Sequence, residues 1–522
     1  MLAAYLKIAL RNLRRHWAFA FINVAGLSVG MASCLLIFLY VRDELSYDRY
    51  HADADRIYRL ALHVDGASFG NGIAKVADPW GPDAKAELPD VVAETRFVFL
   101  GRTLVERADR RQFETEGMYA DSATFNIFSW PLIEGDPDNA LVGPGKIVLT
   151  RSFAERWFGD EDPMGKTLLM DKDDVLTVSG VMEDVPSNSH FTFDFLVSLE
   201  SYQHELRGDW VKWNQFYTYL LLAPSVRPAL VATQVDKILD KHLEPETAAA
   251  YHAFLQPLTS IHLHSHLHRE MSANSNVSYV YIFSTIALFI LVIACANFVS
   301  LSTARSSRRA QEVGIRKVSG ADRSMLVRQF LGESILICMA AVVLAWVLSF
   351  SVLDFFDGVS GKSFGPNALL GWPLATGLLI AACLIGAAAG LYPAVVLSAF
   401  RPVKVLKGDT GPGGARLLRK SLVVLQFTIS ACLLMATGVV YKQLDYIRNK
   451  DLGFNKDQVV IVSTNESATA KHYETIKQQL RRVPGVVNVS FSANRPGGSD
   501  WGIPVDFEGV PDEEELSPRM LC

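Results

Sequence analysis

The chain has 522 residues, of which 50% are hydrophobic and 20% are charged, and its formal net charge is −5. With a mean hydropathy of +0.18, the composition is too apolar for an ordinary soluble protein. It is also too charged for a chain that lies in the membrane throughout, so we expect several apolar spans and at least one folded polar domain. The basic residues gather beside the apolar stretches and not along a polar domain, which argues against nucleic-acid binding.

Five stretches are long and apolar enough to form a helix that crosses a bilayer, which takes about 20 residues. They are residues 18–41, 280–304, 331–353, 374–397 and 422–441. The first has no small-residue cleavage site and continues into Tyr40-Val41-Arg42, so we expect an uncleaved anchor and not a signal peptide. Before it, residues 1–17 place leucines at helical spacing among cations, which predicts an amphipathic helix in the membrane interface.

The positions of lysine and arginine predict the orientation. They are concentrated in 1–17, 305–330 and 398–421, whereas the loop 354–373 holds only Lys362. Five consecutive spans place the three basic segments on one side, and the positive-inside rule makes that side the cytoplasm, with the N-terminus in it.

Two long polar regions, 42–276 and 442–522, are therefore expected to face outward. The first is long enough for one large or two small domains. Its mixture of helical patches and alternating, strand-like runs predicts an α+β fold.

The cytoplasmic segment 305–330 has a pattern beyond its charge. Glu312 stands among seven cations, and apolar residues alternate with glycines: Val313, Gly314, Ile315, Val318 and Gly320. We interpret the segment as a short helical hairpin whose apolar ridge docks into a groove of a cytosolic partner. A solvated loop that only sets topology would explain the cations but not the apolar pattern or the glycines.

This segment resembles the cytoplasmic loop of the FtsX-like and MacB-like ABC permeases. The resemblance rests on residues 312–321 (EVGIRKVSGA) and 329–334 (QFLGES). Three further stretches, in the order and places that the family uses, agree with it. Residues 390–394 (GLYPA) with 397–404 resemble the end of its last span, 48–51 (DRYH) with 55–59 (DRIYR) the start of its periplasmic domain, and 180–190 (GVMEDVPSNSH) a later part of that domain.

The resemblance implies a permease subunit without enzymatic activity of its own, with an outer domain of the MacB periplasmic-core type. ATP would be bound by a separate cytosolic ABC ATPase dimer, and this chain would hold no cofactor. The ATPase would move the spans, and long helices would pass the motion to the outer domain for export, efflux or envelope signalling, a use of ATP called mechanotransmission. Carried over from the family, the coupling residues are Glu312, Val313, Gly314, Ile315, Arg316, Lys317 and Gly320.

The same resemblance implies further partners and a location. The partners would be a second permease half or a second copy of the chain, a periplasmic adaptor and membrane lipid, and the location the bacterial inner (plasma) membrane. The family's usual permease has four spans, whereas here a fifth is expected at 422–441, with 442–522 opening a second outer domain. This order resembles a subfamily with two tandem copies and eight spans, so the chain looks truncated in its second repeat.

Two patterns look like binding sites. The run from Gly159 to Thr167 suggests a phosphate-binding loop, but five residues separate its glycines where such a loop needs four. The run 261–268 places His262, His264, His266 and His268 at every second position, which on a strand would put all four on one face, where Zn²⁺ or Cu²⁺ could bind. No cysteine joins them, so we favour a half-buried strand that leads into the second span, and predict no metal site.

Two other classes of function remain as alternatives. One is a non-ABC receptor or scaffold whose outer domain senses a ligand, and the other is a membrane-anchored enzyme with an outward catalytic domain. A receptor needs an output domain, but the inward loops are short, and an enzyme needs a polar constellation that the sequence lacks. Within the first span, the four-residue spacing of Gly26 and Gly30 predicts close packing against another helix.

Overall fold

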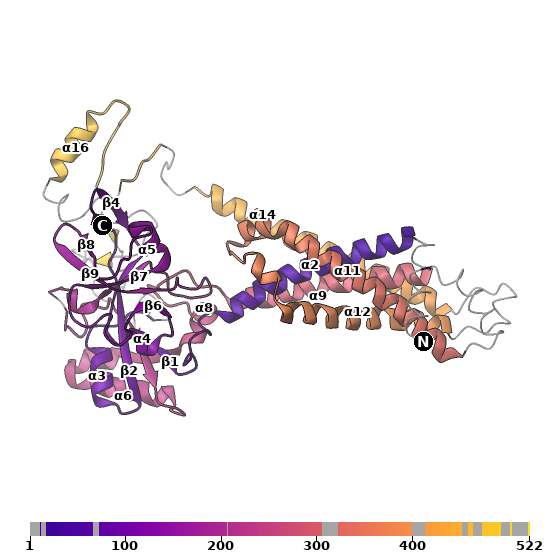
Figure 1. Ribbon diagram of the computed structural model, residues 1–522, viewed down its shortest axis with the longest axis horizontal. Helices are drawn as coiled ribbons and strands as arrows, with labels where there is room; N and C mark the ends of the chain where they lie inside the picture. Colours follow the sequence, from indigo (N-terminus) through magenta and orange to yellow (C-terminus); the bar gives the residue numbers. More distant parts are fainter. Residues whose placement is uncertain are drawn as a thin grey trace, which may run out of the picture.

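Long helices gather at one end of the molecule and a mixed sheet domain lies at the other, as the computed structural model shows (Figure 1). The structure describes residues 11, 17–65, 72–205, 207–304, 322–398, 413–451, 458–462, 472–491, 502–503 and 520–521. Most of the predicted amphipathic helix 1–17, the coupling residues between Glu312 and Gly320, and most of 398–421 and 452–522 lie outside this part of the chain.

Within the described residues, five helices are long and apolar enough to cross a membrane. They are α2 (Trp17–Ser46), α9 (Val277–Ala304), α11 (Arg323–Ser360), α12 (Trp372–Ser398) and α14 (Gly413–Asn449). The expected class of a multispan helical membrane protein is therefore confirmed. All five are longer than the apolar stretch that predicts them, because each helix continues beyond the hydrophobic run at one end or at both.

Glycines set the distance between the membrane helices. A Cβ atom on Gly30 of α2 would lie 2.9 Å from the Cβ of Ala294 on α9, and one on Gly26 would lie 3.5 Å from the side chain of Asn297. The predicted close packing is thus confirmed at Gly30, whereas the distance at Gly26 is that of an ordinary van der Waals contact. On the other side of the bundle, Gly386 of α12 lies against the backbone of Ile335 on α11.

The sheet domain, here called the outer domain (residues 47–276), is built on one twelve-stranded sheet. Its strands are β1 (Ile57–Val64), β2 (Val91–Phe99), β3 (Thr103–Arg107), β4 (Arg110–Glu114), β5 (Gly117–Ala120), β6 (Leu132–Gly135), β7 (Lys146–Thr150), β8 (Thr167–Met170), β9 (Asp174–Met182), β10 (Phe195–Ser198), β11 (Tyr217–Leu222) and β12 (Tyr251–Pro257). They follow the order β12-β1-β11-β2-β5-β10-β7-β9-β8-β3-β4, with β6 paired to β9. The β5–β10 and β7–β9 pairs are parallel and the other pairs antiparallel, so the sheet is mixed.

Among the described residues, five helices of the outer domain pack against this sheet or its edges. They are α3 (Trp80–Glu87), α4 (Thr124–Ile127), α5 (Arg151–Phe158), α6 (Pro228–His242) and α7 (Pro245–Ala250), whereas α8 (Ile261–His264) follows the last strand and contacts α2. Helix α5 packs beside β7 and β9, whereas α3 and α6 pack against the β2, β11 and β12 part of the sheet. The predicted α+β fold is confirmed.

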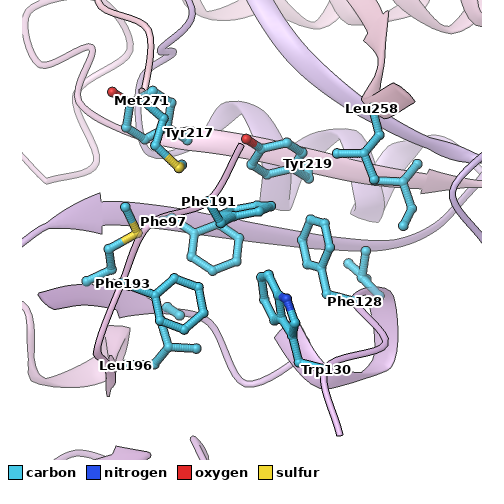
Figure 2. Close-up of a cluster of buried hydrophobic side chains, with 14 of the residues drawn as sticks. Phe97, Phe128, Trp130, Phe191, Phe193, Leu196, Tyr217, Tyr219, Leu258 and Met271 are labelled. Atoms are coloured by element: carbon cyan, nitrogen blue, oxygen red, sulfur yellow. The ribbon is translucent and has the colours of Figure 1, made fainter. Parts of the chain in front are cut away.

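An aromatic cluster forms the core between these two parts of the sheet (Figure 2). Phe97, Phe128, Phe191 and Tyr219 are fully buried, and Trp130 stacks on Phe128 with 4.8 Å between ring centroids. Four separate segments supply these rings, namely β2, the turn after α4, the segment before β10, and β11. Because Tyr50 packs against the same cluster, the core of the outer domain begins four residues after α2 ends.

The glycine packing in the bundle leads to a test. Gly30→Ala forces its new methyl group against a methyl group fixed on the neighbouring backbone, and overpacking of this kind costs about 1–3 kcal/mol. Gly377→Ala in α12, where no atom lies within 4 Å of the added carbon, should be neutral or stabilising. Heating the full chain in detergent and measuring the remaining folded protein compares them; equal melting temperatures for the two variants would contradict the close approach of α2 and α9.

Candidate junction between the membrane helices and the outer domain

The helix α2 enters the outer domain without a flexible linker. It runs along the bundle and ends at Ser46, and its outer end meets the sheet domain beside α8 (Figure 1). Two residues later, Asp48 adopts a left-handed backbone conformation with φ of 57°. A residue with a Cβ rarely adopts this conformation unless its surroundings hold it there.

The hydrogen-bond and ion-pair partners of the Asp48 carboxylate lie in one segment, residues 183–194 between β9 and β10, which we call the strap. Asp48 Oδ1 accepts hydrogen bonds from the His190 amide and from Ser189 Oγ, both at 3.1 Å, and Asp48 Oδ2 lies 2.9 Å from His190 Nδ1. The Asp48 amide in turn donates to the carbonyl of Asn188 at 2.9 Å. One oxygen of this fully buried carboxylate thus accepts two hydrogen bonds and the other lies in ion-pair contact with His190, and contacts of these two kinds offset the cost of burying a charge.

The strap also holds the last residue of α2. Asn188 Nδ2 donates to Ser46 Oγ at 2.9 Å and to the Ser46 carbonyl at 3.2 Å. Two of the motifs that carry the family resemblance, at 48–51 and 180–190, therefore meet in space although about 140 residues separate them.

The rest of the 48–51 motif anchors this contact in the aromatic core. Tyr50 OH donates to Ser189 Oγ at 3.0 Å and accepts from Trp130 Nε1 at 3.1 Å. His51 Nδ1 accepts from the Ser129 amide at 3.0 Å, and its ring lies 5.0 Å from that of Phe128.

Burial and neighbouring groups shift the pKa values of His51 and Asp48, the histidine and the aspartate of this motif. Burial among aromatic rings lowers the pKa of His51 to about 4, so its ring is neutral at physiological pH. Burial opposes ionisation of Asp48, but the adjacent His190 and its hydrogen bonds outweigh this effect and lower the pKa of the carboxyl group below its ordinary value. The junction therefore combines a charged aspartate with a neutral histidine.

A second contact joins α2 to the segment through which the chain returns to the membrane. Glu44, only 2% exposed, lies with its Oε2 atom 3.1 Å from Nε2 of His262 in α8. Tyr47 stacks on the same histidine, with 3.3 Å between the ring centroids. The outer end of α2 therefore touches both the strap and the returning segment.

The histidine run around His262 differs from the expected strand. Residues 261–264 form the helical turn α8, which follows the end of β12 at Pro257 and turns the chain toward α9. Ile261, His262 and Leu263 are all buried, a pattern that alternation along a half-buried strand does not give.

The four histidines of the run consequently do not share one environment. His264 and His266 are exposed, and His266 contacts Asn276 at 3.2 Å, whereas His268 is half-buried and His262 is buried beside Glu44. In the described part of the chain, no group of three or more His, Cys, Asp or Glu side chains is arranged to hold a metal ion.

Arg59, the last residue of the 55–59 motif, fixes the return segment to the sheet. Its guanidinium group is fully buried and pairs with Glu270 at 2.6 and 3.0 Å, while Nη2 also donates to Gln256 of β12 and to Ser265. Both segments that connect the outer domain to the membrane are therefore held by buried, charge-assisted hydrogen bonds.

Sequence reasoning missed the residues that make this junction. In the sequence, Glu44 and Asp48 look like ordinary polar residues at the end of a membrane span. Only Asp48 lies in a motif, residues 48–51, that resembles the family. The predicted coupling residues, by contrast, lie outside the described residues.

These features define a class: a multi-pass membrane protein in which the first described membrane helix, α2, continues directly into an α+β domain. Two family models match the chain, that of the MacB-like periplasmic core domain over residues 20–238 and that of the FtsX-like permease C-terminal region over residues 284–402. The chain is thus a membrane permease of the ABC-transport class that combines a MacB-like periplasmic core domain with an FtsX-like permease region, and its outer domain is the MacB-like domain.

The curated relatives that match the chain have low sequence identity to it. The chain is 32% identical over 124 residues to the macrolide export ATP-binding/permease protein MacB of Sodalis glossinidius, a match that covers 24% of this chain and 18% of that protein. It is 25% identical over 278 residues to the protein of the same name from Neisseria gonorrhoeae, with 50% and 38% covered. The chain thus spans between about a fifth and two fifths of the length of these curated relatives.

Two solved structures resemble the chain in part. One is a domain of a putative permease from Porphyromonas gingivalis, with 25% identity, a TM-score of 0.36, and 40% of this chain and 92% of that chain covered. The other is the periplasmic region of MacB from Actinobacillus actinomycetemcomitans, with 12% identity, a TM-score of 0.30, and 40% and 91% covered.

The neutral, buried His51 predicts how stability depends on pH. Since its pKa is lower in the folded protein than the ordinary 6.5, the unfolded chain binds a proton first as the pH falls. The unfolding free energy should therefore decrease between pH 6.5 and about 4, by up to about 3 kcal/mol. The stabilising contribution of Asp48, whose pKa is lowered, is lost only at still lower pH.

Denaturant unfolding of the full chain in detergent at a series of pH values, followed by tryptophan fluorescence, measures this slope. His51→Asn keeps an acceptor near the Ser129 amide but removes the titrating ring, so its slope between pH 6.5 and about 4 should be flatter. His264→Gln removes an exposed histidine and should leave the slope as in the wild-type chain. An unchanged slope in His51→Asn would contradict the assignment.

Proposed function

We propose that the chain is the permease subunit of an ABC transporter of the mechanotransmission type, which couples ATP hydrolysis in a separate cytosolic ATPase dimer to motion of the outer domain. The observation that carries this proposal is the direct junction at Ser46–His51. A flexible linker would absorb a displacement of the membrane helices, whereas a helix that ends in a buried network of hydrogen bonds passes it on.

The length of α2 supports the same function. Its 30 residues correspond to roughly 45 Å of helix, enough to cross the apolar layer and reach the outer domain as one rod. The return path through α8 is fixed to α2 by His262 and Glu44, so the two connections would move together.

The partner ATPase would bind the ATP, and this chain would need no cofactor. The coupling residues proposed from the family resemblance, Glu312 to Gly320, lie outside the described residues. Directly after them, Asp322 caps α11, where its side chain accepts from the Arg323 amide at 2.7 Å. Any movement of the coupling segment would therefore act on the first turn of a 38-residue helix.

The orientation and the further partners belong to the same proposal. The three basic segments and the N-terminus would lie in the cytoplasm, with the outer domain in the periplasm and the helices in the bacterial inner membrane. Helix α14, which packs on α9 and exposes most of its apolar side chains, would begin a second permease repeat, and those side chains would face lipid, a second permease half or a second copy of the chain. A periplasmic adaptor would complete an export or signalling assembly.

Copurification tests the central claim. The tagged full chain, extracted from its native membrane, should retain an ABC ATPase that mass spectrometry identifies by its Walker A sequence. Glu312→Lys and Gly314→Pro should reduce the recovery at least about tenfold, because they reverse a charge and break a helix in the proposed coupling element.

Glu246→Lys makes the same charge change on an exposed helix of the outer domain and should leave recovery unchanged. Recovery that is equal in all variants would overturn the coupling assignment. A wild-type chain that retains no ABC ATPase would overturn the proposed function and favour the receptor or scaffold.

A further inference from the structure

The loop between α11 and α12 is fixed in a defined shape at the outer face of the bundle. Helix α11 ends at Ser360 and is capped by Gly361, whose φ of 68° lets its amide donate to the carbonyl of Asp357 at 3.0 Å. Asp357 Oδ2 then accepts from the Phe364 amide at 3.2 Å. Trp346 Nε1, farther back along α11, donates to the Leu369 carbonyl at 3.0 Å, so the loop is tied to α11 at two places.

Lys362 lies in this loop and reaches the outer end of α2. Its Nζ atom is 2.6 Å from Asp43 Oδ2, 2.7 Å from Glu44 Oε1 and 3.1 Å from Tyr47 OH. The ammonium group also lies over the ring of Tyr47, 4.6 Å from its centroid. The side chain of Lys362 is only 14% exposed, and those of the two carboxylates are 18% and 2% exposed.

The charge state of Lys362 follows from these contacts. Burial alone would lower its pKa, but the hydrogen bonds to Asp43, Glu44 and Tyr47 outweigh burial and raise the pKa above the ordinary value. The lysine is therefore positively charged at physiological pH, and its two partners hold it in a largely water-free position.

Glu44 connects this lysine to the outer domain. One of its carboxylate oxygens faces Lys362 and the other faces His262 of α8. Three parts of the chain that are far apart in the sequence thus converge on one buried carboxylate: the end of α2, the segment that returns from the outer domain, and the loop after α11.

We infer that Lys362 is the contact through which α11 moves the outer end of α2 and, through Glu44, the outer domain. This inference rests on the proposed function and adds a second path of transmission, in which Lys362 is a positioning residue. Helix α11 is roughly 57 Å long, begins directly after the proposed coupling segment and ends two residues before Lys362. The helix thus connects the proposed coupling segment at its start with the Lys362 ion pairs at its end.

The ion pair contributes something that the apolar packing of α11 on α2 does not. Apolar side chains can slide past one another along a helix groove at small cost, because the attraction between them has no preferred direction. A lysine held by two carboxylates in a buried site resists such sliding, because separation would leave buried charges unpaired. Axial movement of α11 would therefore pull α2 and the His262 segment with it.

Hydrogen exchange of the full chain in lipid nanodiscs tests the link without any ATPase. Lys362→Met should accelerate amide exchange in residues 258–276 by about tenfold, whereas Lys362→Arg, which keeps the charge, should restore most of the protection. Glu44→Gln should accelerate exchange to a similar extent, and adding Lys362→Met to it should have little further effect, since both variants break the same connection. Arg42→Met removes an exposed cation from the same turn of α2 and should leave the exchange as in the wild-type chain.

Unchanged exchange in Lys362→Met would overturn the inference, as would additive effects of Lys362→Met and Glu44→Gln. The same measurement on the complex with the copurified ATPase, with and without ATP, separates transmission from a static anchor. Lys362→Met should keep the ATPase bound but reduce the ATP-induced change in exchange at 258–276 at least about fivefold. A full ATP response in that variant would refute the role of Lys362 and leave the proposed function standing, whereas absence of the ATPase would refute the proposed function itself.

Discussion

The buried carboxylate of Asp48 constrains the outer domain and the membrane bundle at the same time. An ionised group without water is stable only when donors surround it, and here the donors come from Ser189 and His190 of the strap. The left-handed backbone at Asp48 has the same origin, because the strained conformation persists only while these bonds hold it. The conformation of the strap and the direction in which α2 enters the outer domain therefore depend on each other.

The helices of the membrane bundle are held by different interactions in their apolar middle and at their outer ends. In the middle, glycines such as Gly30 let the helices approach closely, and the contacts are van der Waals contacts without a preferred direction. At the outer ends, charged groups such as Lys362 and Glu44 fix the register of one helix against another. The packing thus permits movement along the helices, while the polar ends determine which movements are shared with the outer domain.

The parts of this architecture that the sequence predicts are those with a local signal. Runs of about 20 apolar residues identify membrane helices because a helix of that length crosses the apolar layer and pairs its backbone groups within the one segment. The α+β character of the outer domain was likewise readable from alternating and helical patterns. The histidine run was misread, because its period of two imitates a strand while the burial of Ile261, His262 and Leu263 in a turn depends on partners elsewhere.

The junction contacts are not predictable from local pattern for the same reason. Strands β1 to β9 separate Asp48 from His190 along the chain, and a single sequence holds no record of that pairing. Lys362 did leave a trace, as the only cation in its loop, but its two carboxylate partners precede it by more than 300 residues. The motifs indicated where such contacts lie without indicating what they join.

The unbroken passage from α2 into the outer domain has a geometric consequence. Each residue of an α-helix advances about 1.5 Å and turns about 100°. The number of residues between the glycine face of α2 and Asp48 therefore determines the angle, about the axis of α2, at which the outer domain is attached to the bundle. Within the last turns of α2, a substitution at an exposed position leaves this angle unchanged. An insertion or deletion of one residue there would rotate the whole outer domain relative to the bundle.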